Sequence, residues 1–164
     1  MKAVWIFVDC EGVDWVYGRM REFGAVEYES RAVFHGKDDS YETFKAFADW
    51  LTKFSGRVVL VSDNPAYDAG AMNMLFHKLL GYNPFGHSAR RIGDYYAGLV
   101  GNWYETQAWK SLRVTKHDHN PVHDAMGNVE AFERLQKGER GANARPQFRV
   151  QSSARPARGR RGKV

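Results

Sequence analysis

Two carboxylates at the end of an apolar run are the first residues in this chain that could do chemistry. Asp9 and Glu11 follow the apolar residues 3–8, and side chains two positions apart in a strand point to the same side. Two carboxylates on one face repel each other unless a positive charge lies between them, and no Lys or Arg is adjacent in the sequence. The pair therefore indicates a cation site at the carboxyl end of a strand, where open α/β sheets bind ligands.

A repeated pentapeptide presents two further aspartates. Residues 64–68 read NPAYD and residues 120–124 read NPVHD. Asn can cap a helix and Pro suits the first helical position, so Asp68 and Asp124 are expected in the first turns of two helices. A first-turn carboxylate also complements the helix dipole, and for either aspartate alone that explanation would suffice. Asp63 competes with Asp68 for a place near the strand end, and the pattern favours Asp68.

Together these four acids supply oxygen ligands only, which suits hard divalent cations such as Mg²⁺ or Mn²⁺. A pair of such ions about 4 Å apart can stabilise the attacking and leaving oxygens of a phosphoryl displacement. The chemistry also needs a base, and His119 lies five residues before Asp124, just ahead of the helix cap Asn120. An imidazole can take up a proton near neutral pH, so His119 is the candidate base.

The other histidines near this helix start allow a rival interpretation. His117, His119 and His123 could hold zinc, perhaps with Asp124. A helix start between the second and third histidine makes one converging geometry difficult, and zinc would leave Asp9 unexplained. We therefore expect His123 to face away from the site and residues 117–118 to form a solvated loop.

Periodicity along the chain predicts the elements that must position these residues. The expected strands span residues 3–8, 21–29, 31–36 and 57–62. The expected helices span residues 40–54, 65–80, 89–100, 102–112 and 121–137, with Trp103, Tyr104 and Trp109 as helix-packing residues. A strand meander followed by alternating strands and helices predicts a single-domain α/β protein with a mixed sheet flanked by helices.

Composition narrows the class of protein. The chain has 164 residues, 43% hydrophobic and 14% aromatic, which is typical of a globular domain with its own core. No apolar run approaches the roughly 20 residues that span a bilayer, and residues 3–8 suit a strand better than a signal peptide. The single cysteine, Cys10, excludes an internal disulfide and a CxxC metal site. We expect a cytoplasmic protein without a membrane partner.

Charge is divided unevenly along the chain. Of the formal net charge of +5, residues 138–164 carry +7, from eight Arg or Lys against one Glu, and residues 1–137 carry −2. The terminal stretch is rich in Gly, Arg, Ser and Pro, so we expect a disordered basic tail after a domain of residues 1–137. Such a tail is either a solvated terminus or a phosphate-binding arm, and its segregated charge favours the arm.

In order and spacing, these motifs resemble the DEDDh 3′–5′ exonucleases of the ribonuclease H-like fold. The resemblance rests on Asp9-x-Glu11 after an apolar strand, on the aspartate of NPAYD, and on His119 five residues before Asp124. The short chain and the stretch HNPVHDAMGN look like the small ribonuclease T-like members of bacteria and phages. The resemblance implies a two-metal hydrolase that releases nucleoside 5′-monophosphates from a 3′ end.

By the same resemblance, the metal ligands are Asp9, Glu11, Asp68 and Asp124, the base is His119, and RNA is preferred to DNA. A proofreading-type DNA exonuclease and a non-catalytic nucleic-acid-binding module are the alternatives. Family members are often homodimers, although no feature of this sequence indicates one.

Substrate contacts are expected directly after the first strand. Gly12 permits close backbone approach to a terminal nucleotide, and Trp15 or Tyr17 could stack on its base. Packing of these two aromatic rings against the edge of the sheet is an equally open explanation.

Overall fold

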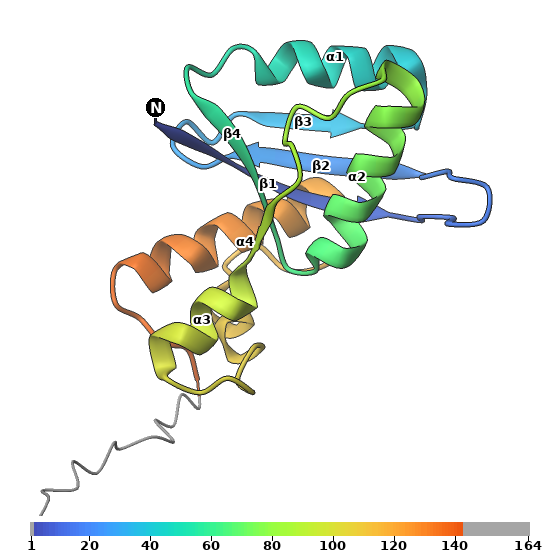
Figure 1. Ribbon diagram of the computed structural model, residues 1–164. Coiled ribbons are helices and arrows are strands. Elements are labelled where there is room, and N and C mark those ends of the chain that lie inside the picture. Colours follow the sequence, from blue (N-terminus) through green and yellow to red (C-terminus); the bar gives the residue numbers. More distant parts are fainter. Residues whose placement is uncertain (1, 143–164) are drawn as a thin grey trace, which may run out of the picture.

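Five strands form a mixed sheet in the order β3-β2-β1-β4-β5 in the computed structural model, which describes residues 2–142 (Figure 1). They are β1 (Ala3–Glu11), β2 (Glu22–Glu27), β3 (Val33–Gly36), β4 (Arg57–Ser62) and β5 (Ala89–Arg91). The first three strands pair antiparallel as a meander, and β4 and β5 continue the sheet parallel to β1. The predicted mixed sheet is confirmed, and its architecture is consistent with a ribonuclease H-like fold.

Helices cover both faces of the sheet (Figure 1). They are α1 (Tyr41–Leu51), α2 (Pro65–Leu80), α3 (Ile92–Val100), the 3₁₀ helix η1 (Ala108–Leu112) and α4 (Pro121–Gln136). Successive side chains of β1 point to opposite faces of the sheet, so this strand contributes to both cores. Ile6 and Val8 belong to the core under α1 and α2, and Phe7 belongs to the core under α4. All of β1 is therefore held between two layers, which fixes the direction of its last residues.

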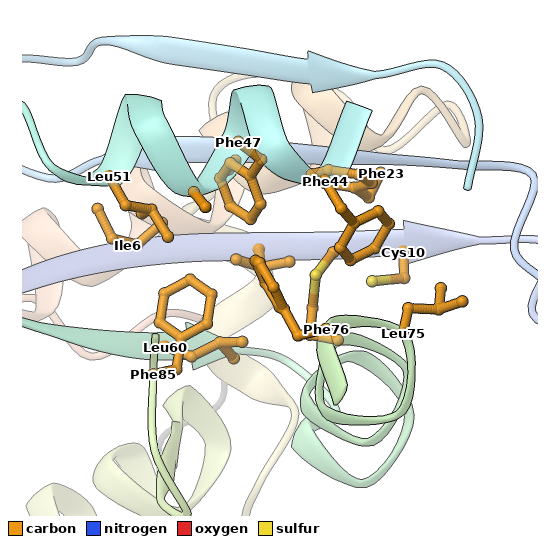
Figure 2. Packing of buried hydrophobic residues seen from close by; sticks show 14 of the residues in the cluster. Ile6, Cys10, Phe23, Phe44, Phe47, Leu51, Leu60, Leu75, Phe76 and Phe85 are labelled. Carbon is orange, nitrogen blue, oxygen red and sulfur yellow. The ribbon is translucent and has the colours of Figure 1, made fainter. Parts of the chain in front are cut away.

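The core between the sheet and helices α1 and α2 contains a cluster of packed aromatic rings. Figure 2 shows Phe44 and Phe47 of α1 stacked over β1 and facing Phe76 of α2. The ring centroids of Phe23 and Phe47 are 4.9 Å apart, and those of Phe44 and Phe76 are 5.0 Å apart. Full burial of each such ring contributes about 1.5–3 kcal/mol, so this layer is a rigid support for β1 and α2.

Gly24 lets the start of α4 approach the other face of the sheet. It lies opposite Asp9 in the β1–β2 register, and a Cβ atom at this position would lie 2.3 Å from the carbonyl carbon of Pro121. No side chain fits in that space, so the glycine brings the first turn of α4 directly over β2 beside Asp9.

Several predicted elements have the bounds that the sequence suggested. The strand 57–62 and the helix 65–80 agree residue for residue, and Ser40 caps α1 by accepting a hydrogen bond from the Thr43 amide at 3.2 Å. The first strand runs on to Glu11, three residues beyond the apolar run. The predicted helix 121–137 ends one residue earlier, at Gln136.

The segment 89–112 departs from the two helices that were predicted there. Residues 89–91 form β5, because their backbone pairs with the edge of β4 at Leu60–Ser62. Residues 102–107 are not helical, because Asn102 and Glu105 side chains accept hydrogen bonds from the Tyr104 and Gln107 amides. Trp109 is fully buried as predicted, but the helix-packing roles predicted for Trp103 and Tyr104 are wrong, because these side chains are exposed.

The last described residues pack against the domain. The Tyr96 hydroxyl donates a hydrogen bond to the Arg140 carbonyl at 2.6 Å, and the Ala142 amide donates to Ser111 Oγ at 3.0 Å. Residues 138–142, assigned to the tail above, are thus held by α3 and η1. The rest of the predicted basic tail lies outside the described residues. Within residues 2–142, none of the helices combines the length and apolar character needed to cross a membrane.

Candidate active site

Asp9 and Glu11 lie at the end of β1, where the strand is still paired with β2 but its pairing with β4 has ended. Both lie on the same face as Phe7, the face that α4 covers, and Cys10 between them points into the opposite core. The Glu11 side chain is 19% exposed. The two acids therefore share one face of β1, as the sequence predicted, and that face is the one covered by α4.

Asp68 is tied to the backbone of β1. Its side chain is buried, and Oδ1 accepts a hydrogen bond from the Cys10 amide at 3.0 Å. Pairing between β1 and β4 ends at Phe7 and Val61, so beyond that point the carboxylate takes the place of a strand carbonyl. Burial raises the pKa of Asp68 to about 7, although the hydrogen bond from Cys10 opposes this shift.

Asp124 is presented by the capped first turn of α4 and is only 1% exposed. Asn120 Oδ1 accepts hydrogen bonds from the Val122 amide at 3.1 Å and the His123 amide at 3.4 Å, which fixes the helix start. Asp124 Oδ1 accepts a hydrogen bond from the Asp118 amide at 3.2 Å. The other carboxylate oxygen, Oδ2, is left for the site.

The strand and helix acids converge. Carboxylate oxygens of Asp9, Glu11 and Asp124 lie within 4.8 Å of one another. Asp68 is outside this group, but it is the strongest acidic influence on Asp9: burial raises the pKa of Asp9 to about 8, and the charge of Asp68 is the next largest cause. The converging oxygens of Asp9, Glu11 and Asp124 suit a hard divalent cation. The positive charge of such a cation would relieve the repulsion between the carboxylates.

His119 lies where the motif predicts it, beside the acids. Its backbone has a φ of 62°, an uncommon left-handed conformation for a residue other than glycine. Its side chain is 74% exposed, and Nδ1 is 3.5 Å from Glu11 Oε1. The imidazole therefore borders both the acid cluster and solvent.

His117 corrects one expectation. It was predicted to lie in a solvated loop, but its Nδ1 atom is 2.7 Å from Asp124 Oδ2. Its ring centroid is 4.6 Å from that of His119, so the two rings adjoin at the edge of the site. His123 does face away, as predicted, and its Nδ1 atom contacts Asp118 Oδ2 at 2.9 Å.

The rival aspartate, Asp63, has positive partners of its own. Its Oδ2 atom lies 2.6 Å from Lys110 Nζ and 3.7 Å from Arg113. Asp63 is therefore neutralised by side chains, whereas Asp68 is the acid with the largest effect on the pKa of Asp9. This geometry favours Asp68 as the member of the acid cluster.

Arg113 is a residue near the site that the sequence did not single out. Its guanidinium is mostly buried, contacts Asn128 of α4 and lies over the Trp109 ring, with 5.0 Å between guanidinium carbon and ring centroid. Its positive charge lowers the pKa of Asp9 against the larger opposing effects. No motif marks Arg113, because only the packing of η1 on α4 brings it near the acids.

The predicted substrate-binding residues lie on the loop that joins β1 to β2 and projects from the domain (Figure 1). Gly12 has a φ of 63°, and a Cβ there would lie 2.8 Å from Arg21 Cβ, so the turn itself requires glycine. The Trp15 ring packs edge-on against Tyr67, with 5.8 Å between centroids, and is half exposed. Tyr17 is 76% exposed and free of such packing.

No protein-family model matches this chain. The chain is similar to the 3′–5′ DNA exonuclease Cap18 of Escherichia coli, with 33% identity over 104 residues, covering 60% of this chain and 56% of that protein. The chain thus spans little more than half the length of this curated relative.

Proposed function

We propose that this chain is a metal-dependent 3′–5′ exonuclease, which hydrolyses phosphodiester bonds from the 3′ end and releases nucleoside 5′-monophosphates. The observation that carries the proposal is the convergence of Asp9, Glu11 and Asp124, with Asp68 adjoining and His119 at the rim. Similarity to a 3′–5′ DNA exonuclease supports the same reaction class. The DEDDh assignment remains part of the proposal.

In this proposal the four acids hold two Mg²⁺ or Mn²⁺ ions. Such ions, when bound, supply positive charge to the attacking and leaving oxygens of a phosphoryl displacement. The contribution of the protein is to hold the carboxylates close together at the end of a rigid strand. The raised pKa values of Asp9 and Asp68 mean that burial disfavours their charged forms, an effect that the charge of a bound cation would oppose.

His119 is proposed to accept the proton of the attacking water. Its ring is exposed, so it can reach a water molecule on the solvent side of the acid cluster, and it is 3.5 Å from Glu11 Oε1. Asp118 Oδ1 accepts a hydrogen bond from the Asn120 amide at 3.0 Å, which closes the turn that carries His119.

The terminal nucleotide is proposed to contact the projecting loop. Trp15 packs on Tyr67, the residue before Asp68, and its exposed half could stack on a base near the acids. Tyr17 is 76% exposed on the same loop, so it could contact the next nucleotide. Gly12 is needed for the turn, so its contribution to substrate binding is indirect.

The sequence resemblance favours RNA, whereas the curated relative is named as a DNA exonuclease, so DNA is the first substrate to test. A homodimer and a cytoplasmic location stay predictions. A non-catalytic binding module on the same fold is the alternative from another class.

The test uses 5′-labelled single-stranded DNA and RNA of one sequence, with Mg²⁺, Mn²⁺ or EDTA. We expect a ladder that shortens from the 3′ end, is lost in EDTA, and is lost in Asp9→Asn and His119→Ala. Matched controls are Asp94→Asn, an exposed acid of α3, and His123→Ala, in the turn after His119. If the wild-type protein binds both substrates but cleaves neither with any metal, the non-catalytic module is the better description.

A further inference from the structure

A second group of metal-binding atoms adjoins the acid cluster. One nitrogen each of His117 and His119 and one oxygen of Asp124 lie within 4.8 Å of one another. Asp124 Oδ2 is buried, and among the described residues its only close donor is His117 Nδ1, 2.7 Å away. This group shares a single residue, Asp124, with the three acids that converge at the end of β1.

The composition of the group selects a different class of cation. Two imidazoles and one carboxylate suit Zn²⁺ and similar transition metals, whereas Mg²⁺ prefers oxygen ligands. The left-handed backbone at His119 turns the loop, so that two histidines only two residues apart present their rings to the same carboxylate.

The geometry leaves room for adjustment. Donor atoms of a tetrahedral zinc site lie about 3.3 Å apart, given zinc–ligand distances of about 2.0–2.1 Å. The side chains of His117 and His119 are 47% and 74% exposed, so both rings can rotate toward such positions. Glu11 Oε1, 3.5 Å from His119 Nδ1, is available as a fourth ligand.

We propose that His117, His119 and Asp124 bind a transition-metal cation of the Zn²⁺ class at a second site, which overlaps the four-acid cluster at Asp124. A cation there would occupy the candidate base and one shared acid. It follows that Zn²⁺ inhibits hydrolysis, a consequence that rests on the proposed function, whereas the binding site itself does not.

The binding test needs no nuclease activity. Purified protein is titrated with Zn²⁺ against a chromophoric chelator, and with Co²⁺ while its visible absorption is recorded. We expect the strong visible bands of four- or five-coordinate Co²⁺, displaced by Zn²⁺, and an affinity for Zn²⁺ at least about tenfold lower in His117→Ala. Circular dichroism checks that the variant is folded.

Two controls separate this site from its neighbours. His123→Ala removes a histidine that contacts Asp118, and it should leave the affinity for Zn²⁺ unchanged. Asp9→Asn alters the acid cluster alone and should change that affinity less than about threefold. The proposal is overturned if Co²⁺ gives only weak octahedral bands, if His123→Ala weakens binding as much as His117→Ala, or if Asp9→Asn abolishes binding that His117→Ala retains.

A separate assay tests the consequence. With excess Mg²⁺, Zn²⁺ should inhibit hydrolysis by the wild-type protein, and His117→Ala should need at least about tenfold more Zn²⁺ for the same fractional inhibition. Zinc binding without inhibition would overturn the inhibitory consequence and leave the site. Absence of all nuclease activity would count against the proposed function, while the binding titration would still decide the site.

Discussion

Helices α2 and α4 begin with the same pentapeptide pattern, yet the two starts are held by different contacts. In α2, Asn64 makes no side-chain cap, and Asp68 is fixed by the Cys10 amide of β1. In α4, Asn120 caps two backbone amides, and Asp124 contacts the loop that carries the histidines. The start of α2 is therefore held by a strand, and the start of α4 is held by the loop before it.

The difference shows that a helix-start pattern sets the position of an acid along its helix but not what surrounds it. Asp68 replaces a carbonyl in the sheet, so its orientation follows from the backbone of β1. Asp124 reaches the same site only because Gly24 admits α4. Its Oδ2 atom faces an exposed histidine, and Asp68 has no such contact among the described side chains.

The largest expected effect is loss of activity when either acid becomes an amide. Asp68→Asn and Asp124→Asn should each lower the rate of 3′-end hydrolysis about 10²–10³-fold, because each removes a charge that the proposed cations need. Initial rates in Mg²⁺ on the labelled substrate measure this.

The control for these two variants is Asp63→Asn, which alters the rival acid that pairs with Lys110. It should keep the rate within about threefold of wild type. If Asp63→Asn were more damaging than Asp68→Asn, the two acids would exchange roles.

The next largest effect is expected from Gly24→Ala, which disrupts the packing of α4 on the sheet. Gly24→Ala puts a Cβ atom 2.3 Å from the Pro121 backbone, so α4 must shift, at a cost of about 3 kcal/mol in unfolding free energy. Thermal melting should show Tm lower by about 6–12 °C, together with a loss of activity. Gly98→Ala, in open space on α3, should be neutral or stabilising by up to about 1 kcal/mol. Equal melting curves for wild type and Gly24→Ala would refute this account of α4.

Sequence patterns predicted the elements whose limits are local and missed the contacts that depend on the chain path. The bounds of α2 follow from Pro65 at its start and Gly81, in a left-handed conformation, at its end. By contrast, β5 is a strand only because β4 offers it an edge, and nothing in its three residues indicates that. Residues 102–107 are not helical despite the predicted helix, because the side chains of Asn102 and Glu105 accept hydrogen bonds from nearby backbone amides.

The candidate site divides in the same way. Asp9 and Glu11 were predictable from strand alternation, and the two helix acids from the repeated pattern. His117 was not, because its contact with Asp124 depends on the turn at His119. Arg113 was not, because η1 brings it over α4 through the Trp109 ring.

A third prediction concerns the pH dependence of stability without metal. The folded-state pKa values of Asp9 and Asp68 are raised, to about 8 and about 7, so these acids favour the folded state fully only below their unfolded pKa near 3.8. Their contribution is lost as pH rises toward 8. In EDTA, Asp9→Asn should therefore gain in Tm over wild type between about pH 5 and pH 8.5, and Mg²⁺ should reduce the difference. A difference that stays constant across this range would contradict the raised pKa of Asp9.

The smallest effect separates the two asparagine caps. Asn120→Ala removes the acceptor of the Val122 and His123 amides, so it should cost about 1 kcal/mol of unfolding free energy. Asn64 is exposed and accepts no side-chain cap bond, so Asn64→Ala should stay within about 0.5 kcal/mol of wild type. Denaturant titration of both variants measures the two changes in unfolding free energy. Equal losses would mean that both caps form in solution and that the two helix starts differ only in their aspartate contacts. A loss confined to Asn120→Ala would mean that the start of α4 needs its asparagine cap. The start of α2 would then be held instead by Asp68 and Tyr67, which accept hydrogen bonds from the Cys10 amide and, at 3.0 Å, from the Val13 amide.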